Sequence, residues 1–235
     1  MTWNRGPSGD GGPRGGPRAS DRRRDFVRPA DDPPGTSRLF IAVPVAESVR
    51  VSIRELMEAV AGASIDERTY GQPRWVRVDG LHLTLRFLGA TPDERQPALG
   101  EAIAAAARSV APFRVVLSGG GAFPDSRWPR VLWIGIAEGA TQLKALATRL
   151  AEELAPIGWP PEGRPFAPHL TLARTDGVPR ADERARRLAE LAEGISLGWQ
   201  VDRIVLYKSI QGHGPARYES LAEAPLWLDG SGSPE

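Results

Sequence analysis

The 235-residue sequence contains no cysteine, only two lysines, and only three histidines, which are His82, His169 and His213. The absence of cysteine excludes disulfides, thiol nucleophiles, iron–sulfur clusters and zinc sites built on cysteine. Because histidines are so few, any chemistry that needs an imidazole must use one of these three side chains.

Long apolar runs are also missing. No stretch approaches the roughly 18 apolar residues of a membrane span, and residues 1–24 lack the apolar core of a secretory signal. We therefore expect a cytoplasmic protein with no membrane contact. The 30 Lys+Arg against 29 Asp+Glu leave a net charge of +1, which argues against a protein that coats nucleic acid by bulk charge but permits a local phosphate site.

The length is that of one large domain or two small ones. Residues 1–36 hold seven glycines and six prolines and are too poor in apolar side chains to form a core. We expect a disordered extension over 1–36, one domain over 37–228 and a disordered tail over 229–235, in a monomer. An alternative is that the seven arginines of the extension form an arm that helps to hold RNA, although five interspersed aspartates weaken it.

Alternating hydrophobic patterns predict an α+β domain. Amphipathic spacing predicts helices over 46–61, 92–110, 139–155 and 180–193. Apolar or alternating runs predict strands over 38–43, 75–78, 81–88, 113–117, 130–136, 168–174, 198–210 and 218–228. The dipeptide Asp79-Gly80 predicts a hairpin turn between the second and third of these strands.

The tetrapeptide His-Leu-Thr-Leu occurs twice, at residues 82–85 and 169–172. At this composition, the chance that a given histidine is followed by Leu-Thr-Leu is roughly 3 in 10,000, so two coincidences among three histidines are not expected. In a strand, alternate residues face opposite sides. Each copy therefore places an imidazole and a hydroxyl about 7 Å apart on one face and its leucines on the other.

Two imidazoles and two hydroxyls suit a metal-free reaction on a phosphoester. A neutral histidine can accept a proton from an attacking water while a protonated one donates to the departing oxygen. The threonines can donate hydrogen bonds to the phosphoryl oxygens, where negative charge accumulates. One histidine on a strand is more often structural, but its duplication favours catalysis. A metal site is disfavoured because neither copy brings a carboxylate to the same strand face.

At these residues the sequence resembles the two-histidine (2H) phosphoesterase superfamily. Within it, the sequence is most similar to the RNA 2′,3′-cyclic phosphodiesterases, also called 2′-5′ RNA ligases, whose hallmark is two copies of His-x-Thr-x. The resemblance covers about residues 38–226. Its most specific blocks are WVRVDGLHLTLRFLG at 75–89, PRVLW at 129–133 and FAPHLTLAR at 166–174.

The resemblance implies a bilobal fold, in which two pseudo-symmetric lobes of antiparallel sheet with helices surround a central cleft. It implies hydrolysis of 2′,3′-cyclic phosphates, on RNA ends or small nucleotides, to 2′-phosphomonoesters, and an associated 2′-5′ ligation. His82 is then the proton donor and His169 the proton acceptor, while Thr84 and Thr171 hold the phosphoryl group. No metal or cofactor is expected.

Three arginines near the motifs are further candidates for phosphate binding, because guanidinium groups match phosphate geometry. Arg86 shares the predicted face of His82, and Arg130 begins a strand beside a glycine-rich loop. Because residues of a strand alternate between its two faces, Arg174 is expected on the leucine face of the second copy. We therefore consider it a weaker candidate for phosphate binding.

Two other functions remain open from the sequence. One is a nucleotide- or RNA-binding module of the same fold with little turnover, against which the intact histidines and threonines argue. The other is a phosphodiesterase for a different cyclic nucleotide-derived phosphate.

Overall fold

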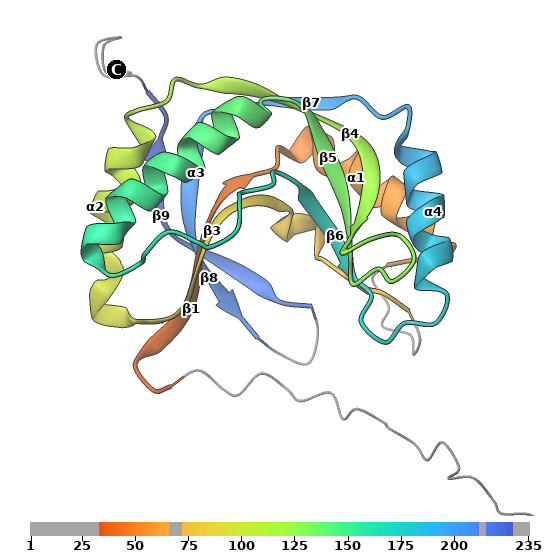
Figure 1. Ribbon diagram of the computed structural model, residues 1–235, viewed down its shortest axis with the longest axis horizontal. Helices are drawn as coiled ribbons and strands as arrows, with labels where there is room; N and C mark the ends of the chain where they lie inside the picture. Colours follow the sequence, from red (N-terminus) through yellow and green to blue (C-terminus); the bar gives the residue numbers. More distant parts are fainter. Residues whose placement is uncertain (1–32, 66–71, 212–214, 228–235) are drawn as a thin grey trace, which may run out of the picture. The chain divides into compact units, whose positions relative to one another are not determined.

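Two antiparallel sheets form the centre of the protein in its computed structural model, which describes residues 33–65, 72–211 and 215–227 (Figure 1). Sheet A has the strand order β3-β1-β8-β9, and sheet B has the order β2-β6-β5-β4-β7. These antiparallel sheets and their helices confirm the predicted α+β class.

Each sheet combines strands from distant parts of the chain. Sheet A consists of β1 (Thr36–Pro44), β3 (His82–Pro92), β8 (Arg203–Ile210) and β9 (Arg217–Pro225). Sheet B consists of β2 (Arg74–Trp75), β4 (Phe113–Phe123), β5 (Val131–Glu138), β6 (Leu170–Arg174) and β7 (Leu197–Val201). The helices are α1 (Glu47–Ala61), α2 (Gln96–Ala107), α3 (Ala140–Leu154) and α4 (Ala181–Ala192), with 3₁₀ turns η1 (Val78–Gly80), η2 (Asp93–Arg95) and η3 (Ala155–Ile157).

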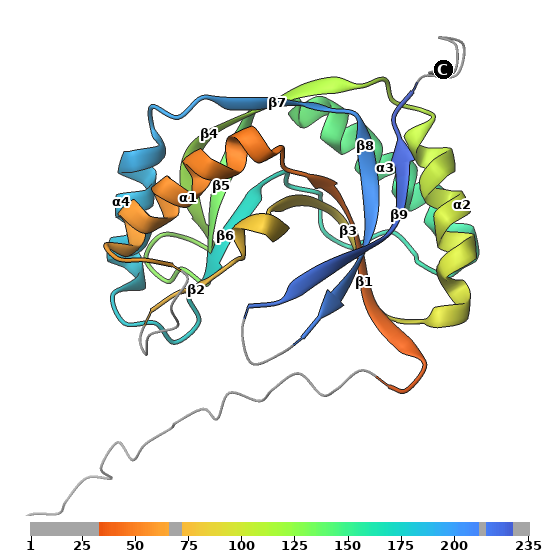
Figure 2. The same ribbon diagram turned by 180° about the vertical axis from the view of Figure 1, so that it is seen from behind.

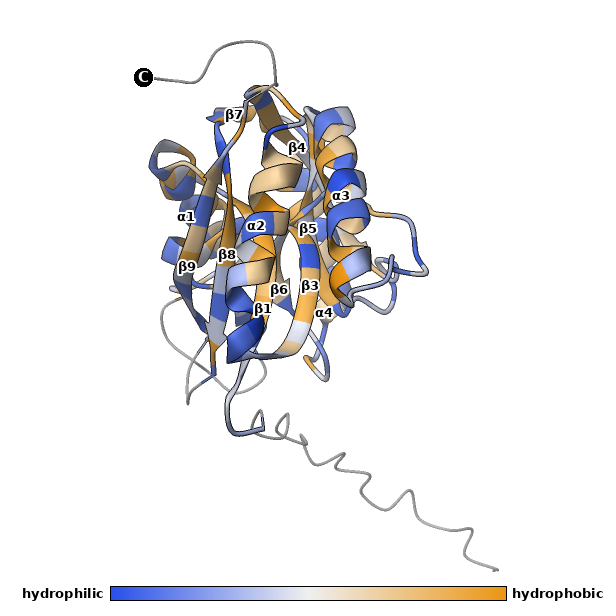
Figure 3. Cartoon of the chain, turned by 90° about the vertical axis from the view of Figure 1, so that its left-hand side faces the viewer, coloured by the Kyte–Doolittle hydropathy of each residue, from blue (hydrophilic) through white to orange (hydrophobic). Residues whose placement is uncertain are grey.

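A pair of helices covers each sheet. Helices α2 and α3 contact each other and strands of sheet A, while α1 and α4 contact each other and strands of sheet B. Figures 1 and 2 show the two pairs at opposite ends of the molecule. The predicted apolar spacing is confirmed in α3, whose four leucines at 143, 146, 150 and 154 are fully buried. Hydrophobic colour follows the strands β1, β3 and β8 in Figure 3.

The predicted hairpin at Asp79-Gly80 is wrong. Strand β2 pairs with β6 in sheet B, whereas β3 pairs with β1 in sheet A, and η1 lies in the segment that crosses between them. The Val76 N–H donates to the Leu172 carbonyl oxygen in that crossing (2.9 Å). The dipeptide does lie in a turn, η1. Long-range pairing, however, decides which sheet the strands before and after this turn join.

The strand predicted over 198–210 is also divided. It separates at Asp202 into β7, in sheet B, and β8, in sheet A. Strand β4 continues to Phe123, through the glycines that the sequence had suggested as a loop. These crossings connect the two sheets into one unit.

The segments predicted to be disordered lie mostly outside the described residues. Strand β1 begins at Thr36, the last residue of the predicted extension. Residues 1–32, residues 228–235 and His213 are not described, so disorder over 1–32 and 229–235 stays a prediction, whereas residues 33–36 form a turn that leads into β1. Among the described residues, no helix is long and apolar enough to cross a membrane.

Candidate active site

The two motif histidines have the same local geometry. His82 begins β3, and His169 directly precedes β6. The Nδ1 atom of each lies 2.7 Å from a carbonyl oxygen two residues earlier, that of Gly80 or Ala167. A carbonyl oxygen can only accept, so Nδ1 carries the proton and donates in both histidines. This leaves Nε2 as the ring atom that can take up or give a proton.

The two motif strands contact each other although they belong to different sheets. Figures 1 and 2 both show β3 and β6 beginning near the middle of the molecule, between the helix pairs. We call the side of each sheet that carries the motif histidine and threonine its motif face. Burial raises the pKa of Tyr218 on β9, and the charge of Arg174 on β6 partly offsets this rise.

Aromatic rings surround His82. The ring centroid of His82 lies 4.7 Å from that of Phe40, 6.2 Å from that of Tyr207, and 5.0 Å from that of Tyr218, which it meets edge-on. Desolvation by these neighbours lowers the pKa of His82 to about 4, while the hydrogen bond to Gly80 acts in the opposite direction. His82 is therefore neutral at pH 7 before a ligand binds.

Aromatic rings also contact His169. Its ring meets Phe123 edge-on at 5.0 Å between centroids, and that of Trp133 at 6.4 Å. In each half of the molecule, one of the contacting aromatic rings packs directly on a glycine. A Cβ at Gly80 would lie 2.7 Å from Tyr218, and one at Gly121 would collide with Trp133. A larger residue at either position would have to displace the ring that packs on it.

The motif threonines lie two residues beyond the histidines and are half-buried. Thr84 is opposite Ala42 in sheet A, and Thr171 is opposite Trp133 in sheet B. Trp133 itself contacts His169. The register therefore places each hydroxyl on the motif face, as the strand period predicts.

A β-bulge follows each threonine at the same position of the motif. Leu85 has no opposite residue between the pairs Thr84–Ala42 and Arg86–Ile41. Leu172 likewise has none between the pairs formed by Thr171 and Ala173 with β5. One extra residue reverses the inward and outward alternation beyond it. The sequence repeat of the two motifs is thus also a repeat of backbone geometry.

The bulge in β3 overturns the predicted orientation of Arg86. Its side chain is only 10% exposed and turns away from His82, toward the segment after α3. There its guanidinium donates to the Pro160 carbonyl oxygen and lies 3.6 Å from the Glu162 carboxylate. The expectation that Arg86 shares the face of His82 is wrong, because strand parity alone does not include the bulge.

The same bulges bring two other residues onto the motif faces. Phe87 and Arg174 each follow their histidine by five positions, and both are exposed. Phe87 is 62% exposed and its ring lies 6.3 Å from that of Phe40. The predicted place of Arg174 on the leucine face is wrong, because the bulge reverses the alternation before it. The only sign of this in the sequence is the identity of the two tetrapeptides, which is consistent with a bulge at the same position in both strands.

Arg130 lies at the other end of β6 from His169. Its carbonyl oxygen accepts from the Thr175 N–H, six residues from His169, which corresponds to roughly 15–20 Å of strand. Its exposed guanidinium forms an ion pair with Asp176 (2.7 Å), which also binds Arg74 (3.1 Å). Burial raises the pKa of Asp176, but the hydrogen bond and charge of Arg130, with the neighbouring arginines, outweigh burial and lower it.

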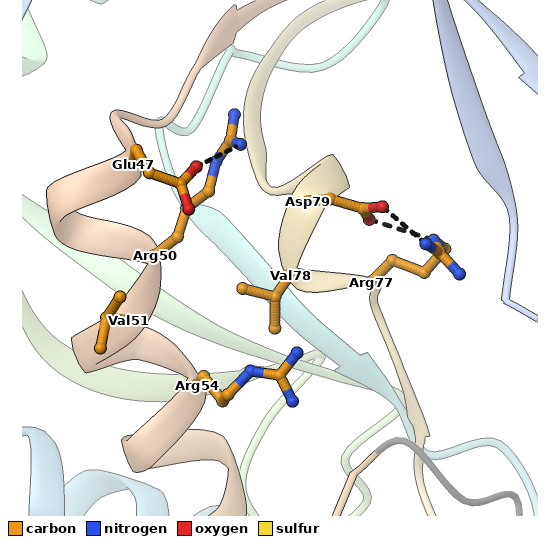
Figure 4. A pocket seen from close by; sticks show the side chains of 7 residues that line it. All are labelled: Glu47, Arg50, Val51, Arg54, Arg77, Val78 and Asp79. Carbon is orange, nitrogen blue, oxygen red and sulfur yellow. Dashed lines mark hydrogen bonds and ion pairs between the residues drawn. The ribbon is translucent and has the colours of Figure 1, made fainter.

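A cavity of about 320 Å³ lies between α1 and η1 (Figure 4). It is lined by Glu47, Arg50, Val51, Arg54, Arg77, Val78 and Asp79, and by neither motif histidine. Arg50 pairs with Glu47 (2.9 Å) and Arg77 with Asp79 (2.6 Å), as Figure 4 shows, and Arg54 lies 3.6 Å from Glu58. Because its arginines face carboxylates, we do not assign an anion to it.

Histidines and carboxylates do not gather into a metal site in the described ranges. No group of three or more such side chains that could hold a metal ion occurs there. The motif regions instead offer imidazoles, hydroxyls and arginines. This set can exchange protons and bind a phosphoryl group without further ligands.

Residues 47–213 match the family model of the 2′-5′ RNA ligase superfamily. The chain is 35% identical over 192 residues to an RNA 2′,3′-cyclic phosphodiesterase of Geobacillus stearothermophilus, covering 81% of this chain but only 57% of that longer relative. It is 30% identical to one from Aeropyrum pernix, covering 73% of this chain and 93% of the relative. It is 36% identical to one from Thermus thermophilus, covering 76% and 85%.

Solved structures show the same fold. The crystal structure of a Thermus thermophilus protein matches with a TM-score of 0.63 and 31% identity, covering 82% of this chain and 99% of that one. The structure of E. coli LigT complexed with 3′-AMP matches with a TM-score of 0.60 and 28% identity, covering 81% and 98%. The bilobal arrangement of two sheets, expected from the resemblance, is confirmed.

Proposed function

The chain belongs to the 2′-5′ RNA ligase superfamily, and from this we propose that it hydrolyses 2′,3′-cyclic phosphates at RNA ends to 2′-phosphomonoesters without a metal. One observation carries the proposal. The two His-Leu-Thr-Leu copies lie on contacting strands of two sheets, with the same Nδ1–carbonyl hydrogen bond and the same bulge. A matched pair of available Nε2 atoms is what paired acid and base catalysis requires.

In the proposed step, the Nε2 atom of His169 accepts a proton from water. The water oxygen forms a bond to phosphorus while the bond from phosphorus to the 3′ oxygen breaks. The Nε2 atom of His82 gives its proton to the departing 3′ oxygen. Hydrogen bonds from Thr84 and Thr171 stabilise the negative charge on the phosphoryl oxygens, which is greatest in the transition state.

This assignment requires a protonated His82, whose pKa in the free protein is lowered to about 4 by burial. An anionic phosphodiester next to the imidazole favours its charged form and raises its pKa. His82 therefore takes up its proton together with the substrate. The hydrogen bond from Nδ1 to Gly80 supports the charged ring, because Nδ1 keeps its proton in both states.

The same groups support joining of RNA ends. If a 5′-hydroxyl replaces water, His169 accepts the hydroxyl proton and the product is a 2′-5′ linkage. Hydrolysis and ligation then differ only in the nucleophile. Their ratio depends on the concentration of RNA 5′ ends relative to water.

The test is product analysis with a short RNA that ends in a 2′,3′-cyclic phosphate, in the presence of EDTA. We expect a 2′-phosphomonoester as the hydrolysis product. His82→Ala and His169→Ala should each lower the rate by about 10²–10⁴, the usual contribution of one acid or base. Leu191→Ala, an exposed position on α4, is the control and should keep the wild-type rate.

Three results would contradict the proposal. They are binding of the RNA end with no product, complete dependence of turnover on an added metal, and full activity in either histidine variant. Binding without turnover would favour the nucleotide-binding module. A panel of other cyclic phosphates, assayed in parallel, shows whether RNA is the preferred substrate.

A further inference from the structure

The loop between β4 and β5 presents an exposed tryptophan on a fixed backbone. Trp128 is 78% exposed. The Oδ1 atom of Asp125 accepts the N–H groups of Arg127 (2.8 Å) and Trp128 (3.1 Å). Where the loop returns to β5, the Arg130 N–H donates to Phe123, and the Thr175 hydroxyl donates to the carbonyl of Pro129 (both 2.7 Å). The indole is thus exposed from an ordered turn, which lowers the entropic cost of binding.

Arginines surround the base of this loop. Arg74, Arg130 and Arg174 all act on Asp176, which places their charges together at the end of β6. With Arg127 and Asp125 in the loop itself, four arginines stand against two aspartates, a local excess of +2. The whole chain has a net charge of only +1. Positive charge combined with an exposed aromatic ring is the chemistry that binds single-stranded nucleic acid.

The loop is continuous with the motif face of sheet B. Phe123, from which it begins, contacts the ring of His169. Arg174, at its base, acts on Tyr218, which contacts His82. Figure 1 shows the β4–β5 loop beside the end of β6. Strand β6 has the second motif at one end and the arginines at the other. An RNA strand whose end is held at the histidines can therefore extend along β6 to the loop.

We propose that Trp128 stacks on a base of the RNA strand that leads to the cyclic phosphate, while the surrounding arginines bind its phosphates. This inference rests on the proposed function and extends it from the terminal nucleotide to an RNA chain. Roughly 15–20 Å of strand separates His169 from Thr175, which binds the far end of the loop at Arg130, and this length corresponds to about five stacked nucleotides at 3.4 Å each. RNA oligomers of at least that length should therefore be preferred over mononucleotides.

The experiment measures KM for a 2′,3′-cyclic mononucleotide and for RNA oligomers of increasing length that end in the same cyclic phosphate. In the wild type, we expect KM to fall as the oligomer reaches about five nucleotides. Trp128→Ala should raise KM for long oligomers at least about fivefold relative to that for the mononucleotide, as expected for one lost stacking contact. Trp128→Phe keeps an aromatic ring and should restore most of the difference.

Val51→Ala, another exposed apolar position, is the matched control and should keep the wild-type ratio of the two KM values. An unchanged ratio in Trp128→Ala, or a wild type without length preference, overturns the inference and leaves the proposed function intact. An unchanged ratio of the two KM values in Trp128→Ala is also expected if Trp128 instead binds a protein. If the wild type hydrolyses neither the cyclic mononucleotide nor the RNA oligomers, the proposed function itself is overturned.

Discussion

The two motif histidines share a backbone hydrogen bond but differ in their surroundings. His82 lies among Phe40, Tyr207 and Tyr218, and burial lowers its pKa to about 4. His169 contacts Phe123 and Trp133 instead. Two identical tetrapeptides thus acquire different environments, which is how a pair of equal side chains can take opposite roles in proton transfer.

The lowered pKa of His82 predicts a pH dependence of stability. An unfolded histidine has a pKa near 6.5, so between about pH 4 and 6.5 the unfolded chain binds more protons than the folded protein. Stability should therefore fall as the pH decreases through this window and should not depend on His82 above it. Urea unfolding between pH 4 and 8 measures this effect.

His82→Asn should weaken the dependence of the free energy of unfolding on pH between about pH 4 and 6.5. Leu191→Ala, which removes no titratable group from an exposed position, serves as the control and should retain the wild-type slope. The lowered pKa values of Asp79 and Asp176 affect stability mainly below the window, because carboxylates titrate near pH 4. An equal slope in the wild type and His82→Asn would show that His82 is not desolvated.

Among the secondary-structure elements, the motif strands matter most because their bulges decide which residues share a face with the histidines. In β3 the bulge at Leu85 turns Arg86 away and exposes Phe87, and in β6 the equivalent bulge exposes Arg174. A bulge depends on how two strands pair, so its position is not readable from one strand's sequence. Of the three candidate arginines, Arg174 is therefore the one that the bulge places on a motif face, although strand alternation predicts it on the leucine face.

The segment before β3 gives a prediction at the same scale. Gly80→Ala should displace the Tyr218 ring, because the new Cβ would lie 2.7 Å from it. Since Gly80 also accepts the hydrogen bond from His82, this displacement should misplace the imidazole and lower kcat by roughly tenfold to a hundredfold. Steady-state kinetics with a 2′,3′-cyclic phosphate measures the loss.

Gly100→Ala in α2 is the control, because a Cβ there meets nothing within 4 Å and alanine favours a helix. A second variant, Gly80→Ala with Tyr218→Leu, removes the collision and should recover part of the rate. If Gly80→Ala alone retains the wild-type kcat, the close packing of Tyr218 does not position His82.

At the scale of the whole molecule, the two motif histidines are divided between the two sheets. His82 begins a strand of sheet A and His169 directly precedes a strand of sheet B. Along the described strands, the chain passes between the sheets four times, between β1 and β2, between β2 and β3, between β3 and β4, and at Asp202. Neither sheet with its helix pair contains both groups. The site therefore exists only when the two halves are packed together.

This division predicts that the two histidines act as one unit. The double variant His82→Ala/His169→Ala should have a kcat/KM close to that of the worse single variant, because removal of either group already disables the paired proton transfer. A double-mutant cycle on kcat/KM measures the coupling. Losses that multiply would show that each histidine works independently of the other.

The sequence alone determined the local patterns. The leucine spacing of α3 and the repeated His-Leu-Thr-Leu are properties of neighbouring residues, and both could be predicted with their helical or strand period. Tertiary structure decided the rest. The segment around Asp79-Gly80 became a crossing between sheets, residues 198–210 divided between two sheets, and bulges exchanged the orientations of Arg86 and Arg174. The physical reason is that strand partners and bulges depend on residues far apart in the chain, whose pairing energy exceeds local preference.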